Sequence, residues 1–139
     1  MKPWSKLQWE LIRHCVLIVE AQSTETGMKL VETVAKDVTI VEASGRLDST
    51  TSKVFVDRLI SLLKSRPRAI LVDLKNIAYI SSSGFHALLI ASRAATKRDG
   101  KVALCGVTGE VKRLFDIGGF SDEFLIFATQ ADGIGNLRP

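Results

Sequence analysis

The sequence predicts a single α/β domain built on a mixed β-sheet. A hairpin of two alternating strands comes first, and short apolar strands then alternate with amphipathic helices. Strands that alternate with helices favour parallel pairing, because a crossover helix brings the chain back to run in the same direction. The predicted order is β-β-α-β-α-β-α-β, a mixed sheet of about five strands with helices packed on it.

Length and composition agree with one globular domain. The chain has 139 residues, of which 46% are hydrophobic and 24% charged, and this composition excludes disorder throughout. The net charge of +4 is small and the basic residues are dispersed, so no nucleic-acid partner is expected. The apolar run around Cys105 predicts a buried thiol rather than a disulfide with Cys15.

The first 27 residues precede the predicted domain, which spans residues 28–139. Apolar residues at helical spacing predict an amphipathic helix over residues 6–20, packed on the domain or on a second copy, and the alternative is a flexible leader. Residues 22–27 form a polar linker, and Met28 is an alternative start of the chain. No signal-peptide cleavage site and no apolar run of about 18 residues is present, so a cytoplasmic protein without a membrane span is expected.

The first half of the domain is a hairpin followed by a helix. Residues 30–34 and 38–41 alternate apolar with polar side chains and predict antiparallel strands. The pattern breaks at residues 45–48, after which Ser49, Thr50 or Thr51 can cap a helix that ends at Pro67. The apolar face of this helix consists of Phe55, Leu59, Leu62 and Leu63.

The second half alternates strands and helices. A buried strand at 69–74 leads through the serines at 81–83 and Gly84 into a helix that runs to about residue 98. A strand at 101–105, a helix at 110–117 and a strand at 124–127 follow. The tail, residues 131–139, is punctuated by glycine and is a poor helix former.

Three segments resemble the STAS domain of bacterial anti-sigma-factor antagonists. They are Gly45-Arg-Leu-Asp48, Ser81-Ser-Ser-Gly84 and Val111-Lys-Arg-Leu-Phe-Asp116, which are similar to the family's Gly-Glu-Leu-Asp, Asp-Ser-Ser/Thr-Gly and Val-Lys-Arg-Leu-Phe-Asp. The resemblance covers about residues 28–127 and implies the STAS fold. The chain departs from the family where Ser81 replaces the Asp and where Phe85 and His86 replace Leu-Gly. It also departs at the C-terminus, where the family's last helix is either rudimentary or replaced by the leader helix as cover.

The resemblance implies a phosphoacceptor at Ser82. Its neighbours would be Asp48, Ser81, Ser83 and Gly84, and the helix with Lys112, Arg113 and Asp116 would contact a partner. A phosphate at a helix N-terminus meets free amides and the positive end of the helix dipole. The alternatives are that the serines and Asp48 only cap helices, and that the charged residues are a solvated face.

The implied function is that of a non-enzymatic anti-sigma-factor antagonist. It would bind an anti-sigma serine/threonine kinase as a monomer or weak dimer, without a cofactor, and phosphorylation would end the binding. The alternative is an unphosphorylated STAS scaffold subunit of an ABC lipid-transport or stress-signalling complex. No Gly-x-Ser-x-Gly elbow supports a hydrolase, and His14 and His86 lack metal-ligand spacing.

Overall fold

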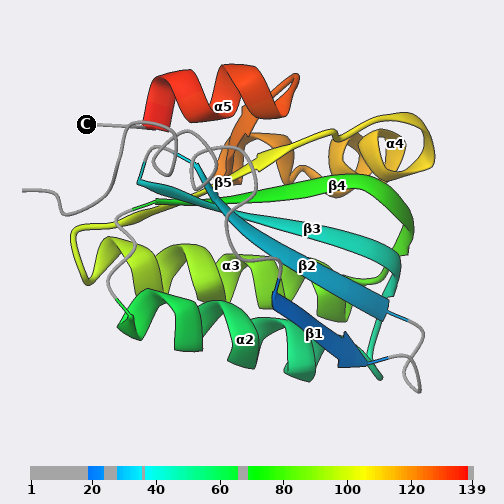
Figure 1. Cartoon of the computed structure of the whole chain (residues 1–139). Coiled ribbons are helices and arrows are strands. Elements are labelled where there is room, and N and C mark those ends of the chain that lie inside the picture. The colour runs from blue at the N-terminus through cyan, green and yellow to red at the C-terminus, as the bar shows by residue number, and fades with distance from the viewer. Residues whose placement is uncertain (1–18, 24–27, 36, 66–68, 138–139) are drawn as a thin grey trace, which may run out of the picture.

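The computed structural model describes residues 19–23, 28–35, 37–65 and 69–137. Its centre is a six-stranded sheet whose strands lie in their order along the chain (Figure 1). The strands are β1 Val19–Ser23, β2 Met28–Ala35, β3 Val38–Leu47, β4 Ala69–Ile80, β5 Lys101–Cys105 and β6 Leu125–Phe127. β2 pairs antiparallel with both β1 and β3, and β3 to β6 are parallel. The predicted hairpin and mixed sheet are confirmed.

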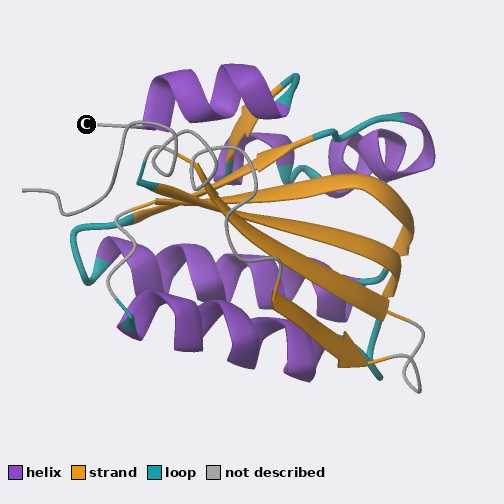
Figure 2. Ribbon diagram, in the orientation of Figure 1, coloured by secondary structure: helices purple, strands orange, loops and turns teal. Residues whose placement is uncertain are grey.

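The helices cover both faces of the sheet. Helices α2, Ser52–Lys64, and α3, Ser82–Thr96, lie side by side on one face, and α5, Gln130–Leu137, lies on the other (Figure 2). Helix α4, Gly109–Gly118, precedes a short 3-10 turn at Ser121–Glu123. The crossovers explain why α2 and α3 share a face, because each links two adjacent parallel strands as a right-handed unit, whereas α5 follows the last strand and is not part of a crossover.

Each face of the sheet has its own apolar cluster, because successive side chains of a strand point to opposite faces. In β4, Ile70 and Val72 join the larger cluster under α2 and α3, whereas Leu71 joins the smaller cluster under α5. Cys105 also lies in the smaller cluster and is fully buried, as predicted. Burial is the first cause that raises the pKa of its thiol to about 12, so the thiol is protonated at neutral pH.

The segment before Met28 differs from its prediction. Residues 19–23 form β1, which pairs antiparallel with β2, although a helix was expected to reach residue 20 and a linker to follow from residue 22. An edge strand offers unpaired amides and carbonyls to any nearby extended segment, and such pairing does not depend on the side-chain period that suggested a helix. The rest of the predicted helix lies outside the described residues.

The C-terminal tail is helical, and the prediction of a poor helix former was wrong. Tertiary contacts outweigh the low helix propensity of its glycines. Gly133 lies so close to the sheet that a Cβ there would come within 2.7 Å of the Leu71 side chain, and Leu137 is buried. The Thr129 hydroxyl accepts a hydrogen bond from the Asp132 amide at 3.1 Å and so helps the helix begin.

A polar clamp holds the start of α5 on the sheet. Glu42 of β3 and Asp73 of β4 are paired neighbours across the two strands. The Gln130 side-chain amide donates to Glu42 Oε2 at 2.8 Å and to Asp73 Oδ2 at 2.7 Å. Asp73 is 5% exposed, so its carboxylate depends on donors supplied by the protein.

Replacing Gln130 by glutamate should lower the free energy of unfolding at pH 7 by about 1–3 kcal/mol, because a shared donor becomes a third carboxylate. The carboxylates of Glu42 and Asp73 raise the pKa of the introduced carboxyl in the folded state. The loss in free energy of unfolding is therefore complete above that raised pKa. It disappears below the unfolded value of about 4.3. Denaturant titrations at pH 7 and pH 4 measure the change. Gln130→Ala removes the donor without adding a charge, so it should lose less stability at pH 7 and show a smaller relief in acid, and equal behaviour of the two variants would contradict the clamp.

Residues 28–139 expressed alone should still unfold in one cooperative transition, because all the residues that the described part of the chain contributes to the two apolar clusters lie within them. The fragment should be less stable than the full chain, since β2 loses its pairing with β1. Chemical denaturation followed by fluorescence and by circular dichroism measures the cooperativity. Transitions that fail to coincide would show that residues 1–27 are part of the core.

Candidate functional site

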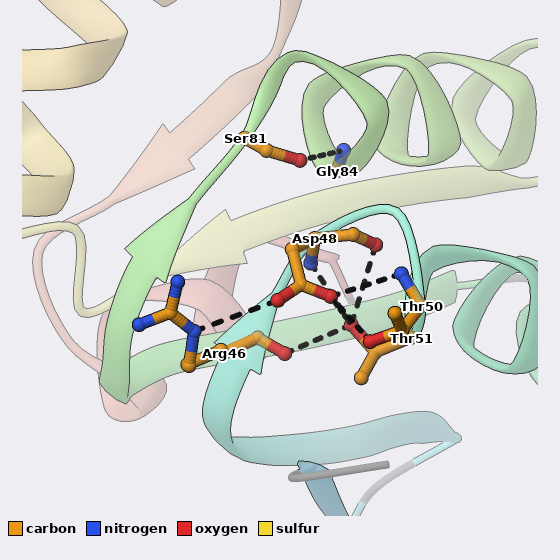
Figure 3. A network of polar contacts seen from close by, with 6 residues as sticks. All are labelled: Arg46, Asp48, Thr50, Thr51, Ser81 and Gly84. Atoms are coloured by element: carbon orange, nitrogen blue, oxygen red, sulfur yellow. Dashed lines mark hydrogen bonds and ion pairs between the residues drawn. The ribbon is translucent and has the colours of Figure 1, made fainter.

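The serine turn, Ser81 to Gly84, joins the end of β4 to the start of α3. Ser81 is the N-cap residue, and its Oγ accepts a hydrogen bond from the Gly84 amide at 3.3 Å (Figure 3). The Ser81 amide donates to the Leu47 carbonyl at 2.9 Å, which ties the turn to the end of β3. Capping, expected of one of the serines, is therefore done by Ser81.

Ser82 and Ser83 are left without a capping role. Both side chains are exposed in the first turn of α3, and within the described part of the chain neither hydroxyl has a hydrogen-bond partner. Their backbone amides belong to the first helical turn, where no intrahelical acceptor exists. The turn thus presents two free hydroxyls beside unpaired amides at the positive end of a helix dipole.

Gly84 sets how close α3 comes to the sheet. A Cβ at this position would lie 2.7 Å from the Leu47 carbonyl oxygen and 2.9 Å from Leu47 Cγ. The same carbonyl accepts the hydrogen bond from Ser81, so it has little freedom to move. The missing side chain is therefore what allows the helix N-terminus to rest on the end of β3.

Asp48 lies in the turn after β3, beside the serine turn (Figure 3). Its Oδ1 accepts hydrogen bonds from the Thr50 amide at 3.0 Å and the Thr50 hydroxyl at 2.7 Å. These bonds, the hydroxyl first, lower the pKa of Asp48, so the carboxylate is ionised at neutral pH. The residue before α2 is Thr51, so Asp48 shapes the turn rather than acting as the N-cap.

Arg46 and Tyr79 extend this site and were not singled out from the sequence. They are paired neighbours on β3 and β4, and the guanidinium carbon lies 5.0 Å from the centre of the Tyr79 ring. Arg46 Nε also lies 3.5 Å from Asp48 Oδ2. The sequence gives little indication of this contact, because the two residues are far apart in the chain and only the register of β3 and β4 brings the arginine onto the tyrosine ring.

Helix α4 is joined to the serine turn through aromatic rings. Phe85, in the first turn of α3, meets Phe115 of α4 edge to face with 4.7 Å between ring centroids. It also stacks on Phe120 at 4.3 Å. The rings hold α4 next to the start of α3, which explains why a large side chain can follow Gly84.

The three predicted α4 residues are exposed, and each forms an ion pair within the helix. Lys112 Nζ lies 3.0 Å from Asp116 Oδ2, and Arg113 makes a two-pronged ion pair with Glu110 at 2.8 and 3.1 Å. These contacts lower the pKa values of both carboxyls, for Asp116 with Lys112 as the first cause. The helix thus presents both signs of charge in a fixed pattern beside the serine turn.

The described residues contain no group of metal-ligating side chains. No described helix is long and apolar enough to cross a membrane. His86 is exposed and lies on α3 with the serines, and no hydrogen bond connects it to Ser82 or Ser83 among the described residues. The site therefore offers exposed hydroxyls, free amides and ordered surface charges.

Comparisons with known proteins point to one domain family. The model of the STAS domain family matches residues 29–133. The anti-sigma F factor antagonist of Paenibacillus polymyxa is 28% identical over 104 residues, which are 74% of this chain and 89% of that protein.

Two solved structures share the fold. The crystal structure of an anti-sigma factor antagonist from Mycobacterium paratuberculosis has a TM-score of 0.74 at 19% identity, covering 85% of this chain and 100% of that one. The phosphorylated form of the Bacillus cell fate determinant SpoIIAA has a TM-score of 0.60 at 18% identity, covering 80% and 99%.

Replacing Gly84 by alanine should destabilise the chain by about 1–3 kcal/mol, because overpacking against Leu47 exceeds the gain of up to about 1 kcal/mol in helix propensity. The matched control is Gly135→Ala in α5, where a Cβ would meet nothing within 4 Å. That variant should be neutral or slightly stabilising. Thermal denaturation of both variants measures the difference, and equal midpoints would show that the Gly84 contact imposes no strain.

Proposed function

Because the chain belongs to the STAS domain family, we propose that it is an anti-sigma-factor antagonist switched by phosphorylation of Ser82. In its unmodified form it binds an anti-sigma serine/threonine kinase, and phosphorylation by that kinase ends the complex. The chain itself acts by binding and not as an enzyme. The proposal is supported by the names of its relatives and by the arrangement of the serine turn.

The observation that carries the proposal is that Ser82 is exposed and unbonded while Ser81 caps the helix. A serine that caps a helix loses a stabilising bond when its hydroxyl is modified. Ser82 stabilises nothing in this way, so its modification leaves the fold intact. The resemblance of residues 81–84 to the family motif selects Ser82 rather than Ser83.

In the proposed reaction, the Ser82 hydroxyl oxygen forms a bond to the γ-phosphorus of ATP held by the kinase. The bond from that phosphorus to the bridging oxygen breaks, ADP leaves, and the hydroxyl proton passes to a base of the kinase. The product adds about −1.5 to −2 charges to a previously neutral turn. Free amides and the helix dipole stabilise this charge locally, whereas an acidic or apolar partner surface would be repelled.

Asp48 and α4 complete the proposed contact surface. The ionised Asp48 lies in the neighbouring turn, where it can orient a basic group of the kinase near Ser82. Lys112, Arg113 and Asp116 offer charge pairs that a partner can complement, and the Phe85 contacts keep them in a fixed position relative to the serines. Exposed charges at the edge of a contact surface govern the specificity and rate of association more than its affinity.

Incubation with the cognate kinase and ATP should add one phosphate, mapped to Ser82 by mass spectrometry. Ser82→Ala should abolish labelling and keep binding, because an exposed hydroxyl without partners contributes little to either fold or interface. Ser82→Asp should weaken binding only in part, since a carboxylate carries less charge than a phosphate.

Ser83→Ala is the matched control, because it removes the neighbouring free hydroxyl and leaves the proposed acceptor in place. This variant should be labelled normally. If labelling is lost in Ser83→Ala and kept in Ser82→Ala, the phosphoacceptor is Ser83. Mass spectrometry of the protein isolated from its own cells is the decisive measurement. An unmodified serine turn in a complex with transporter or stress-signalling subunits would support the scaffold function instead.

A further inference from the structure

His86 lies one helical turn after Ser82 on the same side of α3. Residues four apart in a helix are neighbours on its surface, and side chains lean back toward the N-terminus. A side chain at position 86 is therefore within reach of the first turn, where Ser82 begins the helix. Both side chains are exposed, so neither is held away from the other by burial.

Other cations near the serine turn already have partners. Arg46 pairs with Asp48 and rests on Tyr79, and Lys53 in the first turn of α2 pairs with Asp57 at 2.9 Å. On α4, Lys112 and Arg113 pair with Asp116 and Glu110. In contrast, within the described residues His86 makes no ion pair and no hydrogen bond with any of these groups.

Given the proposed phosphorylation of Ser82, we propose that the His86 imidazole pairs directly with the phosphate. A phosphate that becomes a dianion with a pKa of about 6 would stand beside an imidazole, the side chain that changes charge between pH 5 and 8. The protonated imidazole donates a charge-assisted hydrogen bond to a phosphate oxygen. Free backbone amides at the start of α3 are the competing donors.

The pairing makes the switch dependent on pH. When His86 is protonated, its positive charge offsets part of the phosphate, and the net charge added to the contact surface falls from about −2 toward about −1. Modification then repels an acidic or apolar partner less strongly as the pH falls. A glutamine at position 86 removes the contribution of the imidazole to this dependence, and the contribution that remains comes from the ionisation of the phosphate itself near pH 6.

The test uses full-length protein with phosphoserine inserted at position 82 during translation by an expanded genetic code, so that no kinase is needed. Proton NMR follows the His86 imidazole, whose signals are assigned by their loss in His86→Gln, and phosphorus NMR follows the phosphate. Phosphorylation should raise the midpoint of the His86 titration by on the order of half a pH unit, as expected for a close pair on a helix surface. The phosphate midpoint should fall by a similar amount, because coupling is reciprocal.

Two variants separate the pairing from a general effect of the helix. His86→Gln should return the phosphate midpoint to a higher pH, and His86→Lys should keep it low, since lysine supplies the charge at all pH values used. An unchanged His86 titration, or an unchanged phosphate midpoint in His86→Gln, would overturn the proposal. A phosphate midpoint that responds to Arg46→Gln but not to His86→Gln would assign the role to Arg46. None of these outcomes depends on whether a kinase modifies Ser82, so that proposal is tested separately.

Discussion

The close approach of α3 to the end of β3 is the constraint on which the site depends. The Leu47 carbonyl accepts the Ser81 amide, and Gly84 lets the helix backbone come against the same residue. This contact places the Asp48 turn next to the serines. It also brings the Phe85 ring into contact with Phe115 of α4 and with Phe120 after it. One glycine therefore sets the distance between three segments that are far apart in the chain.

Periodicity and turn residues predicted most of the fold. The alternation over β2 and β3, the apolar strand at residue 69 and the helical spacing after Gly84 each reflect burial on a face that side-chain geometry defines locally. The position of the serines at a strand-to-helix turn was predicted for the same reason. The two elements that differed, β1 and α5, depend on contacts with distant strands, and neither edge pairing nor the fit of Gly133 against Leu71 leaves a local pattern.

Only the structure shows which of the three serines caps α3 and which keep a free hydroxyl. All three are plausible caps by residue type, and only the bond from the Gly84 amide to Ser81 Oγ shows which one is used. The Arg46 and Tyr79 contact likewise follows from the register of β3 and β4, which includes irregularities next to Arg46. Sequence patterns predict which residues gather at a turn, whereas bonding partners are decided by strand register at the scale of single residues.

The sequential order of the strands has a consequence for biosynthesis. Each strand pairs with the strand made just before it, so a nascent chain leaving the ribosome can extend the sheet at a free edge without rearranging what has formed. The β2–β3 hairpin is local in sequence, whereas each parallel pair must wait until the helix between its two strands has been made, which slows its formation. The elements that hold the serine turn, β3, α2, β4 and α3, are complete before β5 is synthesised. The surface proposed to receive the regulatory signal is completed later, when α4 and the segment after it have been made and the rings of Phe115 and Phe120 pack on Phe85.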